Sequence, residues 1–152
     1  MAFFEKYPLV GFHFKVTFIE LFGAEIDSRF HEVTGLSAEM TVEELPEGGE
    51  NRYSHKLPLK AKFPNLVLKR ALSPLPSIIS KWAEDAIYNM EFKPCTVIVS
   101  LLNEDHIPVK NWCFYGAYPV KIHATDLKAQ ENSVVVETLE LVYQYAKPLS
   151  LF

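Results

Sequence analysis

The sequence has little of what disulfide or zinc chemistry requires. Among its 152 residues are two cysteines, Cys95 and Cys113, and neither stands in a CxxC motif or in the paired Cys/His spacing of a zinc site. Both fall in predicted strands of one hairpin, and a turn at residues 103–105 would place Cys95 opposite Phe114 and Thr96 opposite Cys113. Because neighbouring residues of a strand point to opposite faces, the two thiols would face away from each other. We therefore expect neither a disulfide nor a bound metal.

Long apolar runs and clusters of basic residues are also missing. No run approaches the ~20 apolar residues that cross a bilayer, and residues 1–14 lack the basic start, apolar middle and small-residue cleavage site of a signal peptide. The formal net charge of -4 argues against binding nucleic acid irrespective of sequence, since such binding depends on clustered Lys and Arg. We expect a chain that is made in the cytoplasm without a signal peptide and that does not insert into a membrane.

Catalytic motifs are absent from the sequence as well. No HExxH or GxSxG motif occurs, and the Glu-Gly-Gly-Glu segment at 47–50 is not followed by the GK[ST] of a phosphate-binding loop. Two acidic pairs, 43–44 and 104–105, fall in a strand and a turn, where adjacent carboxylates point apart or are solvated. Five histidines show no metal-ligand spacing: His13, His31, His55, His106 and His123. The sequence therefore predicts no catalytic residue, no cofactor and no metal ion.

What the sequence does contain is apolar residues in short alternating runs. Hydrophobic residues make up 49% and charged residues 22% of the chain, which predicts one folded domain over residues 1–152. Runs such as 12–18 and 36–43 alternate with the period of two that is typical of a half-buried strand. Further strands are expected at residues 29–34, 66–72, 95–102, 109–115, 120–125 and 133–145. This order predicts a mainly β domain with one helix packed on it.

The helix is predicted over residues 75–90. Apolar residues recur there at steps of three and four, which places them on one face: Leu75, Ile78, Ile79, Trp82, Ala83, Ala86, Ile87 and Met90. The opposite face is polar and includes Ser80. Burying each large side chain contributes ~1.5–3 kcal/mol, against a few tenths for a surface charge pair, so packing on the sheet should position this helix.

Residues 43–62 form a long polar connector between two predicted strands. Hairpin turns usually contain ~2–5 residues, and loops beyond about 12 residues in a small domain tend to be functional or disordered. Pro46 and the pair Gly48-Gly49 should end the preceding strand. Acidic residues come first in the segment and basic residues later. We interpret the segment as an extended loop that reaches another copy of the same protein.

Seven segments, taken in order, resemble the tube proteins of contractile phage tails and of related extracellular contractile injection systems. They are YPLVGFHFKV at 7–16, FHEVTGLSAEM at 30–40, EGGENRYSHKLP at 47–58, PNLVLKRAL at 64–72, LLNEDHIPVKNW at 101–112, AYPVK at 117–121 and ETLELVYQY at 137–145. Each is short, but the ordered set spans nearly the whole chain. The EGGENR and YPLVGFHF forms look most like the tube initiator, the variant at the baseplate end of the tube.

The resemblance implies a mainly β (α+β) fold of tail-tube type, a β-sandwich or partial barrel with one flanking α-helix. It implies a structural subunit without catalysis, in which hexameric rings stack into a hollow inner tube inside a contractile sheath. The implied partners are the other subunits of a homo-hexamer, adjacent tube rings, the sheath, the baseplate hub and cargo that passes through the lumen. The chain would be made in the bacterial cytoplasm and assembled into a phage tail or injection particle.

The resemblance and the strand patterns together suggest three sets of interaction residues. The connector at about 43–62 would contact neighbouring subunits and the adjacent ring through Glu47, Gly48, Gly49, Glu50, Asn51, Arg52, Tyr53, His55 and Lys56. A polar strand face would line the lumen, or simply be solvated, with Ser37, Glu39, Thr41 and Glu43. One face of the terminal strand would pair across subunits, or form an ordinary sheet edge, with Val135, Leu139, Leu141, Tyr143 and Tyr145.

A second class of function is compatible with the same strands and helix. A small β-barrel binding module could hold a ligand between sheet and helix, and an enzyme is the third alternative. Rings or tubes formed by the purified protein would favour the structural subunit, whereas an unassociated monomer with a closed pocket would favour the binding module.

Overall fold

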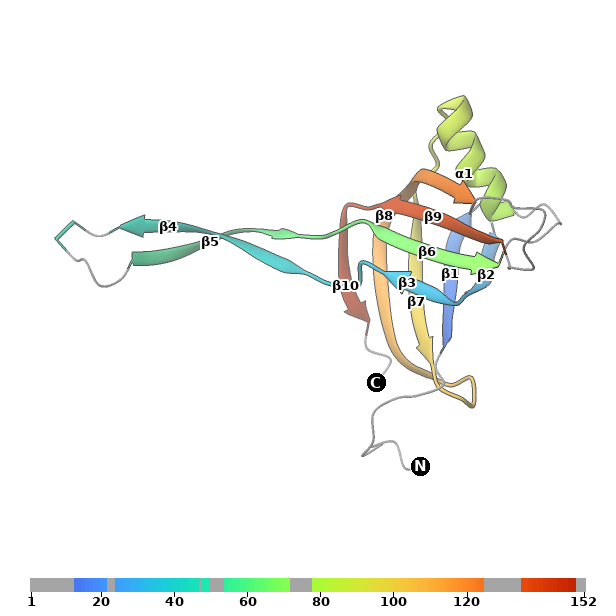
Figure 1. Cartoon of the computed structure of the whole chain (residues 1–152), viewed down its shortest axis with the longest axis horizontal. Coiled ribbons are helices and arrows are strands. Elements are labelled where there is room, and N and C mark those ends of the chain that lie inside the picture. Colours follow the sequence, from blue (N-terminus) through green and yellow to red (C-terminus); the bar gives the residue numbers. More distant parts are fainter. Residues whose placement is uncertain are drawn as a thin grey trace.

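The chain folds into a β-rich body from which a two-stranded ribbon projects (Figure 1). The computed structural model describes residues 13–21, 24–46, 48–49, 54–71, 78–124 and 135–149. The elements are β1 (His13–Leu21), β2 (Ala24–Phe30), β3 (Glu32–Thr34), β4 (Glu39–Pro46), β5 (Ser54–Lys62), β6 (Leu66–Ala71), α1 (Ile78–Asn89), β7 (Cys95–Leu102), β8 (Pro108–Ala124), β9 (Val136–Val142) and β10 (Tyr145–Leu149).

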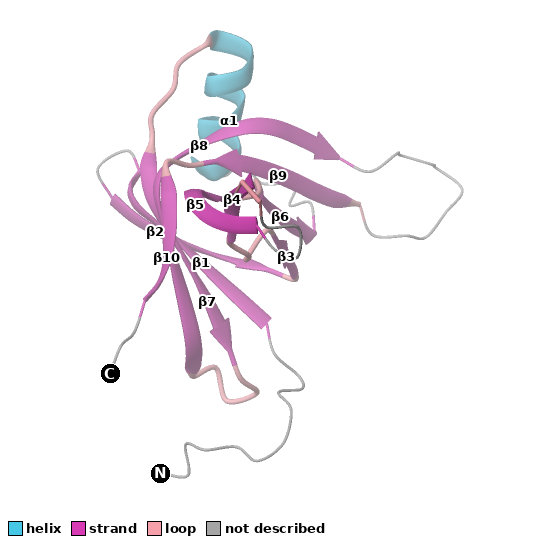
Figure 2. Ribbon diagram, turned by 90° about the vertical axis from the view of Figure 1, so that its left-hand side faces the viewer, coloured by secondary structure: helices cyan, strands magenta, loops and turns pink. Residues whose placement is uncertain are grey.

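The body consists of two antiparallel half-sheets that share β8. One half-sheet has the order β2-β1-β7-β8-β10, and the other has the order β8-β9-β6-β3. The strand β8 is 17 residues long and changes partners near Gly116, whose left-handed φ of 68° suits glycine. Its first part pairs with β7 and β10, and its last part pairs with β9. The two half-sheets therefore bend into the partial barrel that Figure 2 shows.

The core lies between the half-sheets and under α1. Apolar side chains from both half-sheets meet Ile79, Trp82 and Ala83 of the helix there. The Trp82 ring contacts Phe18 edge to face at 5.7 Å, and its Nε1 donates a hydrogen bond to the Lys93 carbonyl oxygen at 2.7 Å. Since Trp82 is 1% exposed, packing on the sheets fixes the helix, as its apolar stripe predicts.

Several expectations for individual elements are corrected by the structure. The single strand β8 replaces the two strands that were expected at 109–115 and 120–125. Ile78 and Met90 were expected on the buried helix face but are exposed. Ile78 is the first residue of α1, and Met90 follows its last turn with a left-handed φ of 56°, so its side chain no longer follows the helical period.

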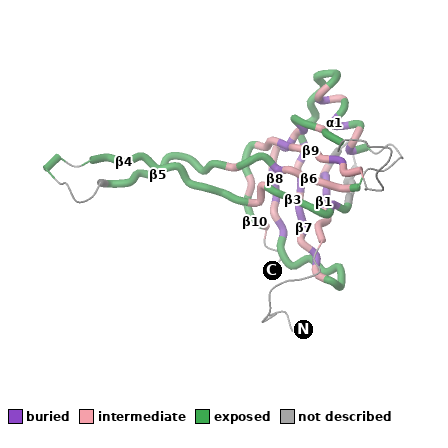
Figure 3. The backbone as a smooth tube through the Cα atoms, viewed as in Figure 1, coloured by how far each residue is buried: buried purple, intermediate pink, exposed green. Residues whose placement is uncertain are grey.

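The segment expected as an extended loop is instead most of a β-ribbon. Among the described strands, β4 and β5 pair only with each other, and they extend the chain far beyond the body (Figures 1 and 3). The expectation of a loop was wrong because a ribbon whose strands mix charged, apolar and proline residues lacks the regular alternation by which strands are recognised. Residues that would form its tip, except Gly48 and Gly49, lie outside the described residues.

Candidate interaction surface

The ribbon is held together by strand pairing and by charge. Glu39 lies opposite Lys62, and Glu44 lies opposite Lys56, and such opposite charges across an antiparallel pair are favourable. Near Thr41 the register shifts by one residue. There the Thr41 hydroxyl donates to the Lys60 carbonyl oxygen at 2.8 Å and accepts from the Lys60 amide at 3.1 Å. The hydroxyl thus satisfies backbone groups at the irregularity.

Both faces of the ribbon carry exposed apolar side chains. Met40 and Val42 project from one face and are 54% and 51% exposed. Leu45 and Leu57 project from the other face, with Leu59 two residues further along β5, and these three are 43–58% exposed. A two-stranded ribbon alone is marginally stable in water, and exposed apolar patches mark interaction sites. The ribbon is therefore suited to being covered on both faces by other protein.

The residues predicted for an inter-subunit loop fall partly on this ribbon. Gly48 and Gly49 lie beyond β4, and Gly49 has a left-handed φ of 86° that glycine permits. His55 and Lys56 lie on β5 and are exposed. The other predicted residues lie outside the described part of the chain: Glu47, Glu50, Asn51, Arg52 and Tyr53.

The predicted lumen residues also belong to the ribbon or its root. Glu39, Thr41 and Glu43 lie along β4, and Ser37 lies in the segment that leads to it. The sequence predicted that this strand would bury its apolar face, but all of β4 is exposed. That expectation was wrong because apolar and polar residues alternate in the same way whether the apolar face packs on the chain's own core or on another molecule. The lumen assignment itself stays a prediction.

The C-terminal run divides into two strands with different neighbours. In β9, Leu139 and Leu141 are buried in the chain's own core, and β6 and β8 occupy both edges of the strand. Their alternation therefore reflects the intrachain core, and the expected role of these residues in pairing across subunits stays a prediction. Val135 precedes β9 and is half-buried, and Tyr143 lies between the two strands. Tyr145 lies on β10 and stacks on Tyr115 at 4.5 Å.

The open sheet edges lie elsewhere in the body. Among the described strands, β10 pairs with β8 alone and β2 pairs with β1 alone. These two strands end the same half-sheet on opposite sides, so each leaves a row of backbone groups for a further strand. The sequence signal for β10 was weak because the alternation runs on through Tyr143 and Gln144 without a break.

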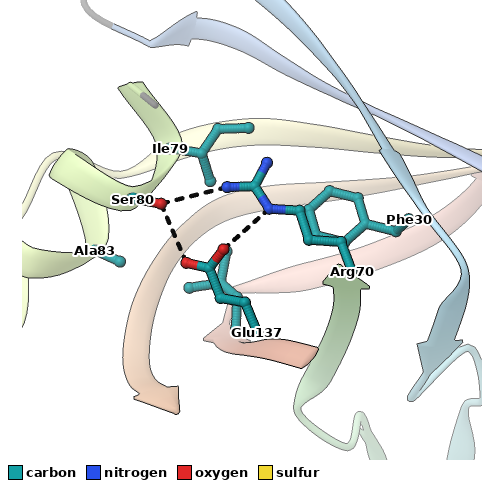
Figure 4. Close-up of a pocket in the computed structure, with 7 residues that line it drawn as sticks. Phe30, Arg70, Ile79, Ser80, Ala83 and Glu137 are labelled. Carbon is teal, nitrogen blue, oxygen red and sulfur yellow. Dashed lines mark hydrogen bonds and ion pairs between the residues drawn. The ribbon is translucent and has the colours of Figure 1, made fainter. Parts of the chain in front are cut away.

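A polar network lies beneath the helix and closes the space between α1 and β9 (Figure 4). Arg70 Nε donates to Glu137 Oε2 at 3.1 Å, and Arg70 Nη2 donates to Ser80 Oγ at 3.3 Å. Ser80 Oγ donates in turn to Glu137 Oε1 at 3.1 Å. The Arg70 guanidinium lies 5.4 Å from the centre of the Phe30 ring. The space that these side chains line has no room for a water molecule, so a ligand has no place between sheet and helix at this point.

The described residues give no positive sign of metal or disulfide chemistry. No group of three His, Cys, Asp or Glu side chains in the described ranges could hold a metal ion. Cys95 and Cys113 are free and buried, and burial raises the pKa of the Cys95 thiol to about 12. Cys95 lies opposite Ala117 and Cys113 opposite Ile98, so the predicted register was wrong. The thiols still face opposite sides of the sheet.

No helix in the described part of the chain is long and apolar enough to cross a membrane.

A half-buried histidine and an exposed one meet where β1 begins beside the β7–β8 turn. His13 Nε2 and His106 Nδ1 are 2.8 Å apart, with the rings edge to face. Partial burial, the neighbouring His106 and then Arg29 lower the pKa of His13 below its ordinary value of 6.5. Two fully protonated rings would present only donors to each other, so the contact requires a neutral imidazole.

We expect this contact to make stability depend on pH. The unfolded chain binds a proton at His13 more readily than the folded chain, so this contribution is complete above pH 6.5 and is lost as pH falls through the lowered pKa. Replacing His13→Gln should flatten the fall of the melting temperature on acidification below neutral pH. His123→Gln, at an exposed histidine of β8, is the matched control. An equally steep fall in H13Q and the parent protein would contradict the prediction.

Comparison with known proteins adds the family context. A family model described as T4-like virus tail tube protein gp19 matches residues 10–147. None of the curated proteins matches the chain. A chain in the cryo-EM structure of the anti-feeding prophage (AFP) baseplate, 6-fold symmetrised, is 30% identical. The match covers 97% of this chain and 99% of that one, with a TM-score of 0.85.

Two further solved structures share the fold at lower identity. A chain in the PVC sheath-tube complex, an extracellular contractile injection system in the extended state, is 19% identical. That match covers 96% of this chain and 94% of that one, with a TM-score of 0.79. Hcp1 from Flavobacterium johnsoniae is 12% identical, with 90% and 94% of the two chains covered and a TM-score of 0.54.

Proposed function

The chain belongs to the T4-like virus tail tube protein gp19 family, and we propose that, as a member of it, this chain forms the tube ring that lies next to the baseplate. It is a structural tail tube protein of a contractile phage tail or injection system and not an enzyme. The predicted fold, mainly β with one flanking helix and of tail-tube type, is confirmed. We treat residues 1–152 as a single tail tube domain with the ribbon as its projecting part.

The ribbon is the observation that carries the proposal of ring assembly. Its apolar side chains are exposed on both faces, and the described residues of the chain do not cover them. In a closed ring of identical subunits, a head-to-tail contact repeats until the ring is complete. We infer that each ribbon lies against neighbouring copies, in its own ring or the next one, and that these copies cover the exposed apolar side chains.

The open edges of one half-sheet support the same arrangement. The strands β2 and β10 lie at opposite ends of that half-sheet. Pairing of β10 in one subunit with β2 in the next is a head-to-tail contact and would satisfy both rows of backbone groups. The hexameric ring implied by the family resemblance agrees with the 6-fold symmetry stated for the AFP baseplate structure.

The position next to the baseplate is supported by the pattern of likeness. The chain is 30% identical to a chain of the AFP baseplate structure but 19% identical to a chain of the PVC sheath-tube complex. On this proposal its partners are the baseplate hub below, a tube ring above, the contractile sheath outside and cargo in the lumen. The lumen residues we propose are Ser37, Glu39, Thr41 and Glu43, which would give the channel an acidic, hydrophilic lining.

Counting copies in intact particles tests the position. Quantitative mass spectrometry of purified particles should find one ring of this chain per particle, in constant ratio to a baseplate subunit, whatever the tail length. The sheath subunit in the same sample is the control, because its copy number rises with tail length. A copy number that rises with the sheath would assign the chain to the bulk of the tube and overturn the baseplate position.

Ring formation is tested separately with the purified chain. Electron microscopy should show rings or tubes, either of the chain alone or after tube fragments are added as nuclei. A chain that stays monomeric under both conditions would contradict the proposal of ring assembly.

A further inference from the structure

The two segments at the root of the ribbon pass in direct backbone contact. The outgoing segment contains Gly35, which has a left-handed φ of 96°. A Cβ atom at this position would lie 2.2 Å from the carbonyl oxygen of Asn65 in the returning segment. Only glycine fits both the conformation and the space. The root is therefore a tight crossing and not a loose pair of linkers.

The returning segment is also tied to the body by side chains. The Tyr143 hydroxyl donates to the Pro64 carbonyl oxygen at 2.7 Å, and the Tyr143 ring lies 6.0 Å from the Phe63 ring. Asn65 Nδ2 donates to Glu140 Oε2 of β9 at 3.2 Å. Three consecutive residues of the returning segment, 63–65, are thus held by β9 and the residue that follows it.

Tyr143 is itself anchored in the core. Its ring packs edge to face on Phe114 at 4.8 Å, and Phe114 is 2% exposed. Burial raises the pKa of Tyr143, so the hydroxyl stays protonated and keeps its donor proton. Beyond the root, β4 and β5 have only each other as partners among the described strands, so the direction of the ribbon depends on the root.

We propose that Gly35, Asn65, Glu140 and Tyr143 form a root clamp that fixes the direction of the ribbon before a neighbouring subunit binds, with Tyr143 as the positioning residue. The inference rests on the proposed role of the ribbon in contacting other copies. The strands of the ribbon have eight and nine residues. At ~3.3 Å per residue the ribbon reaches ~30 Å, so a tilt of ~10° at the root moves its far end by ~5 Å. An interface element that is already oriented loses less conformational freedom on binding.

Distance measurement between spin labels tests the clamp. Labels at Lys56→Cys on the ribbon and Lys81→Cys on α1 occupy exposed positions, whereas the native cysteines are buried. Mixing labelled chain with excess unlabelled chain confines the measurement to one molecule. Tyr143→Phe removes the hydroxyl but keeps the ring, and it should broaden the distance distribution and shift its mean. Asn65→Ala should do the same.

The matched control is Tyr118→Phe, which removes a hydroxyl from a half-buried tyrosine of β8 whose ring faces Phe92. It should leave the distribution as in the parent protein. Thermal melting should show that Y143F and Y118F are both folded, so a broadened distribution reports orientation. Distributions in Y143F and N65A as narrow as in the parent protein would overturn the clamp. This readout does not depend on assembly, so failure of the ring proposal would appear only in the microscopy of tubes.

Discussion

Replacing either Val42→Glu or Leu57→Glu is expected to abolish tube formation while leaving the subunit folded. These side chains project from opposite faces of the ribbon and are 51% and 43% exposed in the single chain. A new carboxylate there remains solvated in the monomer, so the body should fold normally. In the assembled tube the same carboxylate would be buried without a partner, which costs several kcal/mol at each interface. The cost recurs at every copy in a ring.

The measurement is electron microscopy of the purified variants, with circular dichroism to confirm that each is folded. Val42→Ile and Leu57→Met are the matched controls, since they keep the apolar character at the same positions and should still give tubes. Because each variant changes one face of the ribbon, the two results also show whether neighbouring subunits cover both faces. Tubes in V42E but not in L57E would mean that only the Leu57 face meets a neighbour, and normal tubes in both would contradict the role of the ribbon.

The body was predictable from the sequence where local pattern and final environment agree. The alternation around Val16 and Phe18 marks a half-buried strand, and that is what β1 is. The three and four residue steps around Trp82 mark a helix that packs on a sheet, and Trp82 is buried in the core. In these elements the apolar positions of the sequence pattern are the positions that pack in the core of the chain itself, so the pattern predicts the buried face correctly.

The ribbon could not be predicted because its pattern has another cause. Met40 and Val42 alternate with polar residues as a core strand does, yet no part of the chain that the structure describes covers them. Alternation of apolar and polar residues predicts that one face of a strand is buried. It does not predict whether the same chain or another molecule buries that face. The same reasoning applies to Leu139 and Leu141, whose alternation suggests a subunit interface and which are buried in the core of the single chain. Burial within the subunit and burial between subunits therefore produce the same alternation of apolar and polar residues in the sequence.

The network of Arg70, Ser80 and Glu137 was missed for a different reason. Glu137 interrupts an otherwise apolar strand face, and Ser80 stands on the polar side of the predicted helix. A single carboxylate in an apolar stripe is a signal for a buried ion pair, because it requires a partner when the face is buried. Its partner is Arg70 on β6, and sequence alone does not show that β6 lies beside β9.

Removal of the Glu137 carboxylate is expected to destabilise the subunit by about 3–5 kcal/mol, because the Arg70 charge would stay largely buried without its anionic partner. The Arg70 and Glu137 side chains are 16% and 10% exposed. Urea denaturation of Glu137→Ala measures the loss in the free energy of unfolding. The control is Glu32→Ala, since Glu32 pairs with Lys69 at 3.6 Å through side chains that are 49% and 37% exposed. That exposed pair should contribute less than ~1 kcal/mol.

A double substitution separates the contribution of the ion pair to the free energy of unfolding from the destabilisation caused by a buried unpaired charge. Arg70→Met combined with Glu137→Leu removes both charges and keeps apolar volume beneath α1, so it should cost less than Glu137→Ala alone. If the double variant is as unstable as E137A, the loss comes from packing around Phe30 and Ile79 and not from the isolated charge. If E137A costs no more than E32A, the network contributes little to stability. The expected result is a large loss of stability in E137A that the double variant recovers. It would show that the polar network requires both charged partners, and that the helix can also pack on an apolar surface.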